Sequence, residues 1–438
     1  MTDGVAHIPE ALARRSLETV PRSFYLYDRQ GRPAMHPGGD HVHFDPGSSC
    51  LNILDPETQQ ARPALAADLV KMVEVAEMLP QFAAQSTAMA CNDVPPQIGG
   101  WDRRFAGFVA FGKAAGHRCI LPSSLHTRLA LLAIESGRRE APRSKPRAIF
   151  DVCPSPPLNW SEFASQNLVD RARAGVPAEI VSMPLAGATA PVTWVGSVVQ
   201  QAAEGISGIV IHQLAPPGAP VVWGAAPAIF EVRTGKTPRG AIETALLDVV
   251  GAQVGKYIGL PTHAHRVAGD GRVMDVQVEM ESGISTVLGA LAGINMISAA
   301  GMLDFRACHS IEKLVIDGEA IASAERLIEG IEPRTETVAL AAFAQTGMQG
   351  DFLKLKETRA RFRKEQHFPP SIIDRLTGAR LDIWNSGSCT GKSRAVPGGI
   401  PACRDFCRPG TGDVEFCRSR SRTSGIRGAP GDSRLNVD

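Results

Sequence analysis

The segment from Ile258 to Asp304 constrains the fold of this chain more than any other. It begins with a short apolar strand, continues through an irregular polar loop and an amphipathic helix, and ends in a second apolar strand that stops at Gly301. Neighbouring parallel strands must be joined by a crossover, usually a helix, so this order is typical of a parallel sheet. Loops at the carboxyl ends of parallel strands commonly carry catalytic residues. The polar loop is therefore the first candidate for a functional site.

The same alternation of strand and helix runs through the rest of the body. The pattern predicts strands near residues 41–45, 82–90, 118–121, 147–153, 178–183, 220–224, 262–267 and 296–300. It predicts helices over about residues 64–78, 161–174 and 242–257. Asn159 and Glu162 resemble a capping box at the start of the second helix, and Gly175 provides its carboxyl cap. About eight such units predict a TIM (β/α)8 barrel with a C-terminal helical extension. A dinucleotide-binding fold is not expected, because no G-x-G-x-x-G motif lies between a strand and a helix.

Charge and hydropathy exclude several classes of protein. A net charge of +1 over 438 residues gives no sign of a nucleic-acid or membrane-surface partner. The uncharged run 205–230 contains four prolines, and the run 282–303 is interrupted by Gly293 and Asn295. Neither run predicts a transmembrane helix. The amino terminus lacks the basic stretch and apolar core of a signal peptide, which predicts a cytoplasmic protein.

The last part of the chain differs from the body, so we expect a barrel domain over residues 1–385 and a disordered tail over 386–438. The tail consists largely of Ser, Arg, Gly and Cys, with runs such as CRSRSRTSGIRG, and cannot bury enough apolar surface to offset the entropy of ordering. A shifted reading frame in the gene would explain this break, and a natural basic tail is the alternative. The tail holds four cysteines without a C-x-x-C pair or nearby His, so zinc is not expected: Cys389, Cys403, Cys407 and Cys417. The five cysteines of the body are expected to be free thiols, mostly buried: Cys50, Cys91, Cys119, Cys153 and Cys308.

Several long blocks occur in the order seen in one enzyme family. They are CPSPPL at 153–158, ARAGVPAEIVSMPLAGATAPV at 172–192, GISGIVIHQLAPPGAPVVWG at 205–224 and FEVRTGKTPRGAIE at 230–243. With the 258–304 segment, they make the chain resemble the trimethylamine–corrinoid methyltransferase family from about residue 118 to 384. The first hundred residues resemble it less closely, and the family's usual N-terminal helical segment has no counterpart.

The resemblance also assigns residues of the polar loop. The run DGRVMD at 270–275 stands against a DAKVPD-like run of the family, and Ala268 then occupies the position of pyrrolysine. The chain thus resembles the branch without pyrrolysine, which includes glycine betaine methyltransferases. The catalytic residues that this register implies are Asp270, Arg272, Asp275, Gln277 and Glu281.

The resemblance implies transfer of a methyl group from an amine nitrogen to the cobalt of a corrinoid (cobalamin). The expected partners are a small quaternary or tertiary amine, the cognate corrinoid protein that carries the cofactor, and further copies of this chain in a homo-oligomer; no metal is expected on the chain itself. A neutral tertiary amine is a poor methyl donor because its leaving group is a very basic amide anion, and Ala268 offers nothing to activate it. A quaternary ammonium such as a betaine already carries the charge. We therefore expect demethylation of a quaternary amine.

Substrate binding calls for groups that recognise a cation with no proton to donate. Trp223 and Phe230 flank the predicted barrel rim and are candidates for cation–π contacts, although packing is the commoner use of such residues. Asp270 and Glu281 would balance the cation. His265 is a further substrate-binding candidate, and Arg266 or Arg272 would grip a betaine carboxylate.

Two alternative functions stay open. His41/His43 and His263/His265 form two H-x-H pairs on predicted strands, where both members of a pair share one face. If both pairs faced inward, they would suit a metal-dependent barrel hydrolase. The other alternative is an inactive remnant of the methyltransferase family, because both ends of the chain depart from the family pattern.

Overall fold

The computed structural model describes residues 4–28, 30–47, 49–94, 144–333, 339–348, 350–370, 372, 373 and 375, together with the backbone of residues 114–118. The described residues divide into two units. One holds residues up to 55 and from 60 to 367, and includes the barrel. The other holds residues 56–59 and those described from 368 onward.

Eight parallel strands form the barrel in the first unit. They are β3 (His43–Pro46), β6 (Ala84–Ser86), β7 (Ala114–Arg118), β8 (Ala148–Val152), β9 (Ala178–Ser182), β11 (Val221–Ala225), β13 (Thr262–His265) and β14 (Met296–Ala300). From β6 to β14 each strand pairs with the next, and β14 pairs with β3. A parallel bridge between Phe44 and Phe82 joins β3 to the start of β6 and closes the ring, with Ala83 N donating to Phe44 O at 3.0 Å. This confirms the predicted TIM barrel.

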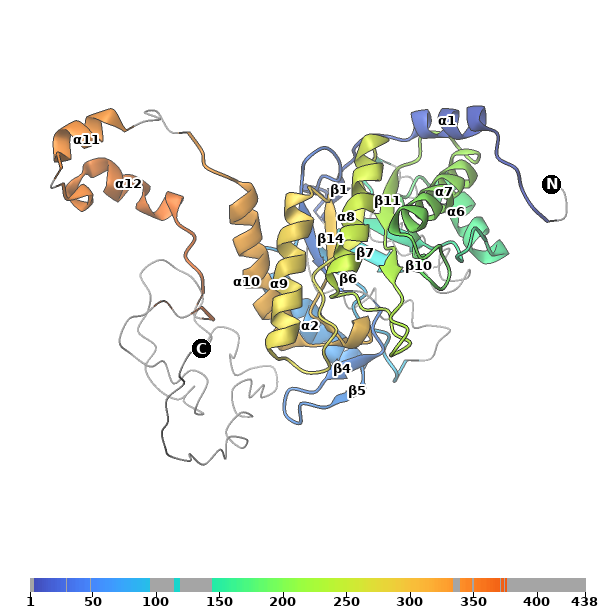
Figure 1. Cartoon of the computed structure of the whole chain (residues 1–438), viewed down its shortest axis with the longest axis horizontal. Coiled ribbons are helices and arrows are strands. Elements are labelled where there is room, and N and C mark those ends of the chain that lie inside the picture. Colours follow the sequence, from blue (N-terminus) through green and yellow to red (C-terminus); the bar gives the residue numbers. More distant parts are fainter. Residues whose placement is uncertain are drawn as a thin grey trace, which may run out of the picture. The chain divides into compact units, whose positions relative to one another are not determined.

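Helices cover the outside of the barrel (Figure 1). They include α2 (Ala66–Met78), α6 (Glu162–Ala174), α7 (Trp194–Gln213), α8 (Ile242–Tyr257), α9 (Val276–Leu291) and α10 (Ile311–Ile328). From α6 to α10, consecutive helices pack against each other, and α1 (Glu10–Thr19) packs on α7. The chain continues into the short helices α11 (Leu340–Thr346) and α12 (Lys356–Glu365), in the region of the predicted helical extension. None of the helices in the described part is long and apolar enough to cross a membrane.

Apolar side chains close the amino-terminal end of the barrel. An antiparallel hairpin of β1 (Leu26–Tyr27) and β2 (Pro33–Met35) lies beneath the strands. Leu26 and Met35 pack in one buried cluster with four residues near the amino ends of barrel strands: Ala84, Ile149, Val222 and Met296. A cavity inside the barrel can therefore open only toward the carboxyl ends.

Short additional strands border the carboxyl ends. β10 (Leu185–Ala186) and β12 (Ala228–Ile229) form a parallel pair just beyond β9 and β11. A four-stranded sheet joins β15 (Met302–Leu303), β16 (Cys308–His309), β4 (Asn52–Leu54) and β5 (Ala61–Pro63). It ties the segment that follows β14 to the segment that follows β3, and so shapes one side of the barrel mouth.

The structure corrects some predicted boundaries. Ser161, not Asn159, is the N-cap of α6, since the Ser161 hydroxyl accepts from Ala164 N at 3.1 Å. Gly175 ends this helix with φ 68°, as expected of a left-handed cap. The strand predicted at 118–121 is β7, which ends at Arg118; residues 119–121 lie outside the described part. The described cysteines are thiols that are not joined in disulfides, and two of them are buried: Cys50 and Cys308 are buried, Cys91 and Cys153 are partly buried, and Cys119 is outside the described part.

Candidate active site

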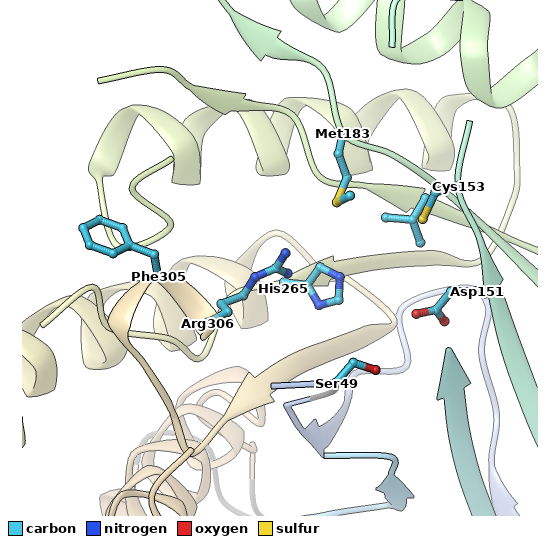
Figure 2. A pocket seen from close by; sticks show the side chains of 8 residues that line it. Ser49, Asp151, Cys153, Met183, His265, Phe305 and Arg306 are labelled. Carbon is cyan, nitrogen blue, oxygen red and sulfur yellow. The ribbon is translucent and has the colours of Figure 1, made fainter. Parts of the chain in front are cut away.

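A cavity of about 110 Å³ lies at the carboxyl end of the barrel (Figure 2). Its lining residues come from β8, β9, β13 and the segments after β3, β8, β9 and β14: Ser49, Asp151, Cys153, Val181, Met183, His265, Phe305 and Arg306. One water needs roughly 10–15 Å³ of such volume, so the cavity has room for a small molecule of several heavy atoms.

Strand alternation explains which side chains point into the barrel. Successive side chains of a strand face opposite sides, so Asp151 and Cys153 share the inner face at β8, and Val181 and Met183 share it at β9. By the same alternation, Glu179 and His263 also face the barrel interior, two residues before Val181 and His265 on their strands. TIM-barrel interiors are usually filled by branched apolar residues, so a polar layer here is unusual.

A serine connects the two histidines of β13. The Ser298 hydroxyl on β14 lies 2.9 Å from His263 Nε2 and 2.6 Å from His265 Nδ1. The two imidazole rings are perpendicular, with centroids 4.6 Å apart. All three side chains are buried. Because one hydroxyl contacts both rings, the orientation of His265 on the cavity wall depends on Ser298 and, through it, on His263.

Three carboxyl groups surround His263; those of Asp45 and Glu179 are buried, and that of Asp151 is partly buried. Glu179 is in close contact with His263 Nδ1, and Asp45 and Asp151 also act on the imidazole electrostatically. Burial raises the pKa of Glu179 to about 8, and a side-chain hydrogen bond with Asp151 and the charge of Arg171 oppose that rise. Burial also raises the pKa of Asp45 and lowers that of His263. At neutral pH, a protonated Glu179 therefore faces a neutral His263.

The rim of the cavity is formed by a turn after β15. Phe305 and Arg306 reach the cavity from this turn, and Figure 2 shows the Arg306 guanidinium beside His265. The Lys236 ammonium lies 5.7 Å from the centroid of the Phe305 ring. The mouth thus combines an aromatic and a cationic side chain above an acidic interior.

Asp270 and Glu281 lie beside this cavity without lining it. The Asp270 carboxylate accepts from Arg239 N and Gly240 N, both at 2.8 Å, and Asp270 N donates to Glu281 Oε2 at 2.7 Å. Burial raises the pKa of Asp270, against the two backbone hydrogen bonds. A Cβ atom on Gly240 would lie 2.4 Å from Glu281 Oε2. These contacts join the polar loop to the segment before α8.

The other three residues of the polar loop are exposed. Asp275 is the N-cap of α9, and its carboxylate accepts from Val278 N at 3.1 Å. The Gln277 amide donates to Glu281 Oε1 at 2.9 Å. Arg272 is 78% exposed and lies 3.6 Å from Asp304. The loop does follow β13 at the carboxyl face, as predicted, but its carboxylates mainly accept from backbone N–H groups and its one arginine lies near Asp304, outside the cavity.

The structure places Arg266 and Trp223 on the outer faces of their strands. Arg266 is fully buried between the barrel and the helices, where it donates to Asp248 Oδ2 at 2.8 Å and to Arg239 O at 2.6 Å. Trp223 is 1% exposed and its indole N–H donates to Gly251 O at 2.9 Å in α8. Phe230 is partly buried just after β12. Among the four substrate-binding candidates, His265 alone lines the cavity.

The two histidine pairs have different surroundings. His41 is exposed, with its ring centroid 4.5 Å from that of His36 in a tilted arrangement, and His43 Nε2 lies 3.2 Å from His36 N. His263 and His265 instead contact Ser298 inside the barrel. Across the described ranges, no group of three or more His, Cys, Asp or Glu side chains is arranged to hold a metal ion. The hydrolase alternative gains no support from this arrangement.

No sequence motif marks the acidic residues of the barrel interior. Asp45, Asp151 and Glu179 each stand inside a run that was correctly predicted as a strand, among mainly apolar neighbours. Burying a lone charge within a strand costs free energy unless the charge has a partner or a function. A single acidic residue inside an apolar strand is therefore itself an indication of a site. Arg306 carried no such signal, because its turn has no characteristic sequence pattern.

Ala268, the residue aligned with pyrrolysine, is fully buried. It belongs to the apolar cluster that includes Ala264 and Val267, and forms a parallel bridge with Met302. It does not line the cavity.

A TIM barrel with a polar cavity at its carboxyl face has the architecture of an enzyme. A family model described as trimethylamine methyltransferase (MTTB) matches residues 1–396. The trimethylamine methyltransferase MttB of Methanosarcina thermophila is 31% identical over 380 residues, which cover 85% of this chain and 77% of that protein. The glycine betaine methyltransferase of Desulfitobacterium hafniense (strain Y51) is 24% identical over 396 residues, covering 89% of this chain and 81% of that protein.

Among solved structures, the monomethylamine methyltransferase of Methanosarcina barkeri aligns with a TM-score of 0.48 at 12% identity, over 75% of this chain and 69% of that one. The sequence relationships, by contrast, extend over most of the chain. This chain belongs to the trimethylamine methyltransferase family and is an enzyme of the methyltransferase class. The family predicted from the sequence blocks is thereby confirmed.

Proposed function

We propose that this enzyme takes a methyl group from a small quaternary ammonium compound, such as a betaine, and passes it to the cobalt of a corrinoid carried by a partner protein. The observation that carries the proposal is the acidic interior of the barrel, where Asp151 lines the cavity above Asp45 and Glu179. Carboxyl groups around a small cavity are suited to a cation that has no proton to donate.

The size of the cavity is consistent with a small donor inside the barrel and a corrinoid that stays outside it. About 110 Å³ has room for a small amine but not for a corrinoid ring, so the corrinoid would have to reach the mouth from outside. The nitrogen–methyl bond would break with its electron pair left on nitrogen, which releases a neutral tertiary amine. A corrinoid in the cobalt(I) state supplies the electron pair of the new cobalt–carbon bond.

The chain's own residues would bind and orient the donor. Glu179 is mainly protonated near neutral pH in the absence of a cation, because burial raises its pKa to about 8, and burial also raises the pKa of Asp45. A quaternary nitrogen in the cavity would favour their ionised forms and thereby be stabilised by them. The pair His263 and Ser298 would hold His265 in place on the wall, next to the donor.

A protonated tertiary amine is a second candidate donor. The favouring observation is Glu179, since a carboxylic acid with a pKa of about 8 can give its proton to an amine, and its side-chain hydrogen bond with Asp151 leads toward the cavity. The leaving group would again be a neutral amine. Ala268 supplies no activating group, so this substrate would depend on a proton from a buried acid such as Glu179.

One assay distinguishes the two donors. Reduced cobalamin, or the cognate corrinoid protein, is mixed with the enzyme and with glycine betaine, choline or trimethylamine, and methylcobalt formation is followed by absorbance. We expect turnover of a quaternary amine and none of trimethylamine. Turnover of trimethylamine that is lost in Glu179→Gln would support the second candidate, and no methyl transfer from any of the amines would overturn the proposal.

A further inference from the structure

The rim turn Asp304–Arg306 has a strained backbone. Three successive residues have left-handed φ values, 47° at Asp304, 54° at Phe305 and 70° at Arg306. Such values are uncommon for residues other than glycine and cost free energy at each position. Three in a row persist only where surrounding contacts hold them, and strain of this kind is concentrated at ligand-binding sites.

Contacts from neighbouring loops hold the turn. Asp304 N donates to Gly271 O at 2.8 Å, which joins the turn to the loop after β13. Ala307 N donates to Asp304 O at 2.9 Å and closes the turn on itself. Lys236, from the loop after β12, lies over the Phe305 ring. Arg306 is therefore presented to the cavity from a fixed support.

The Arg306 side chain gives the cavity two sides of opposite character. In Figure 2, His265 lies between the Arg306 guanidinium and the Asp151 carboxyl group. The charge of Arg306 helps to lower the pKa of His263, although burial is the larger cause, so the guanidinium acts on the barrel interior. The acidic side is Asp151 with the buried carboxyl groups beneath it, and the cationic side is the rim.

We infer that Arg306 anchors a carboxylate of the methyl donor, so that the substrate is a small zwitterion with its ammonium group inward and its carboxylate at the rim. This inference rests on the proposed function. A guanidinium has five N–H donors and binds a carboxylate in a fork geometry while keeping contacts with the protein. A cavity of about 110 Å³ allows only a short spacer between the two charges.

Three ligands test the anchor on the unmodified enzyme. Glycine betaine carries the carboxylate, its methyl ester has nearly the same shape without that charge, and choline has a hydroxyl in its place. Isothermal titration calorimetry measures their dissociation constants without any need for the corrinoid protein. We expect glycine betaine to bind at least about tenfold more tightly than the ester or choline, as a charge-assisted hydrogen-bonded pair would give.

Two variants of Arg306 and one control variant test whether the preference for glycine betaine depends on the Arg306 guanidinium. Arg306→Gln should weaken glycine betaine at least about tenfold and leave the ester and choline unchanged or slightly tighter, because a positive charge is removed. Arg306→Lys should keep part of the affinity, since it keeps the charge but not the fork. Arg14→Gln is the matched control, because Arg14 is 73% exposed on α1, which packs on α7 outside the barrel, and it should leave all three constants unchanged.

The outcomes separate this inference from the proposed function. Equal binding of the three ligands, or equal weakening of all three in Arg306→Gln, would overturn the anchor and leave quaternary-amine transfer standing. Failure of the unmodified enzyme to bind any of them would overturn both. Arg306→Gln could fail to fold, which its melting transition would show. In that case, the affinities of glycine betaine and its ester are compared on the unmodified enzyme and on Arg306→Lys, and this comparison still decides whether Arg306 anchors the carboxylate.

Discussion

His263 and Glu179 face each other inside the barrel, in close contact and both fully buried. An exposed pair of this kind would be an imidazolium and a carboxylate near neutral pH. Here burial lowers the pKa of His263 and raises that of Glu179 to about 8, so both are neutral. The barrel therefore holds an acidic group that becomes negative only when the pH rises or a cation arrives.

This pair predicts pH-dependent binding of cations. Tetramethylammonium should bind more tightly as the pH rises from about 7 to about 9, because Glu179 ionises through about 8 and only its ionised form attracts the cation. Asp45, Asp151 and Asp248 also act electrostatically on His263, and burial raises the pKa of Asp45, so ionisation of Asp45 acts in the same direction. Calorimetry at several pH values measures the affinity.

Glu179→Gln is the control for this dependence. The amide is neutral at every pH and nearly the same size, so the variant should lose most of the rise in affinity. Calorimetry in buffers of different ionisation enthalpy should also show that the native enzyme releases protons on binding near pH 7. An affinity that does not change with pH in the native enzyme would contradict the assignment.

Ser298 should be important for both stability and transfer. Ser298→Ala removes the hydroxyl that contacts His263 and His265, and leaves two buried imidazoles short of a partner. The expected loss is about 1–3 kcal/mol in the free energy of unfolding. Methyl transfer should also slow, since His265 loses its support. Chemical denaturation measures the first and the methylcobalt assay the second.

Ser285→Ala provides a matched comparison. Ser285 is equally buried, but its hydroxyl accepts only a long hydrogen bond from Arg266, at 3.4 Å. Its removal should cost less than about 1 kcal/mol. If the two serine variants are equally stable and equally active, the contact between Ser298 and the histidines has no special importance.

The tail should contribute nothing to the stability of the barrel. Residues 386–438 lie outside the described part, so this prediction rests on their low content of large apolar side chains. A chain truncated after residue 385 should melt at the same temperature as the full chain and transfer methyl groups at the same rate. A drop of many degrees in scanning calorimetry would show that the tail packs on the folded body.

The sequence predicts the fold well because local and global signals agree. Each of the eight predicted strands overlaps a barrel strand, although 118–121 meets β7 only at Arg118. About eight consecutive strand–helix units then predict a closed parallel barrel. Finer details depend on geometry: Ser161 rather than Asn159 caps α6, since the choice between nearby polar residues is made by a single hydroxyl position.

The site is harder to predict than the fold. The many charged residues of the polar loop after β13 predict a site there. In the structure, however, Asp275 caps a helix and Arg272 is largely exposed. The cavity instead collects single residues from segments far apart in the sequence, such as Ser49 after β3 and Asp151 on β8. Their meeting depends on the closure of the barrel and on the inward phase of each strand, which periodicity places only to within a residue or two.

Variants of Asp270 can distinguish a role in holding the fold from a role in binding the substrate. Its carboxylate accepts two backbone N–H groups, from Arg239 and Gly240, and so fixes the segment that leads into α8. If this is its main contribution, Asp270→Ala should lower the free energy of unfolding by about 2–4 kcal/mol, because two buried donors lose their acceptor. The value of kcat/KM should fall with it, through a displaced loop.

Asp270→Asn tests the alternative, in which the carboxylate balances the substrate cation. The amide retains one acceptor but no charge. For a positioning residue, this variant should lie between the native enzyme and Asp270→Ala in stability, with a KM for the quaternary amine near the native value. For a residue that balances the cation, Asn and Ala should raise KM equally. Denaturation curves and a KM-against-kcat comparison of the two variants decide, and we expect the graded result, because both carboxylate oxygens are already engaged by backbone donors.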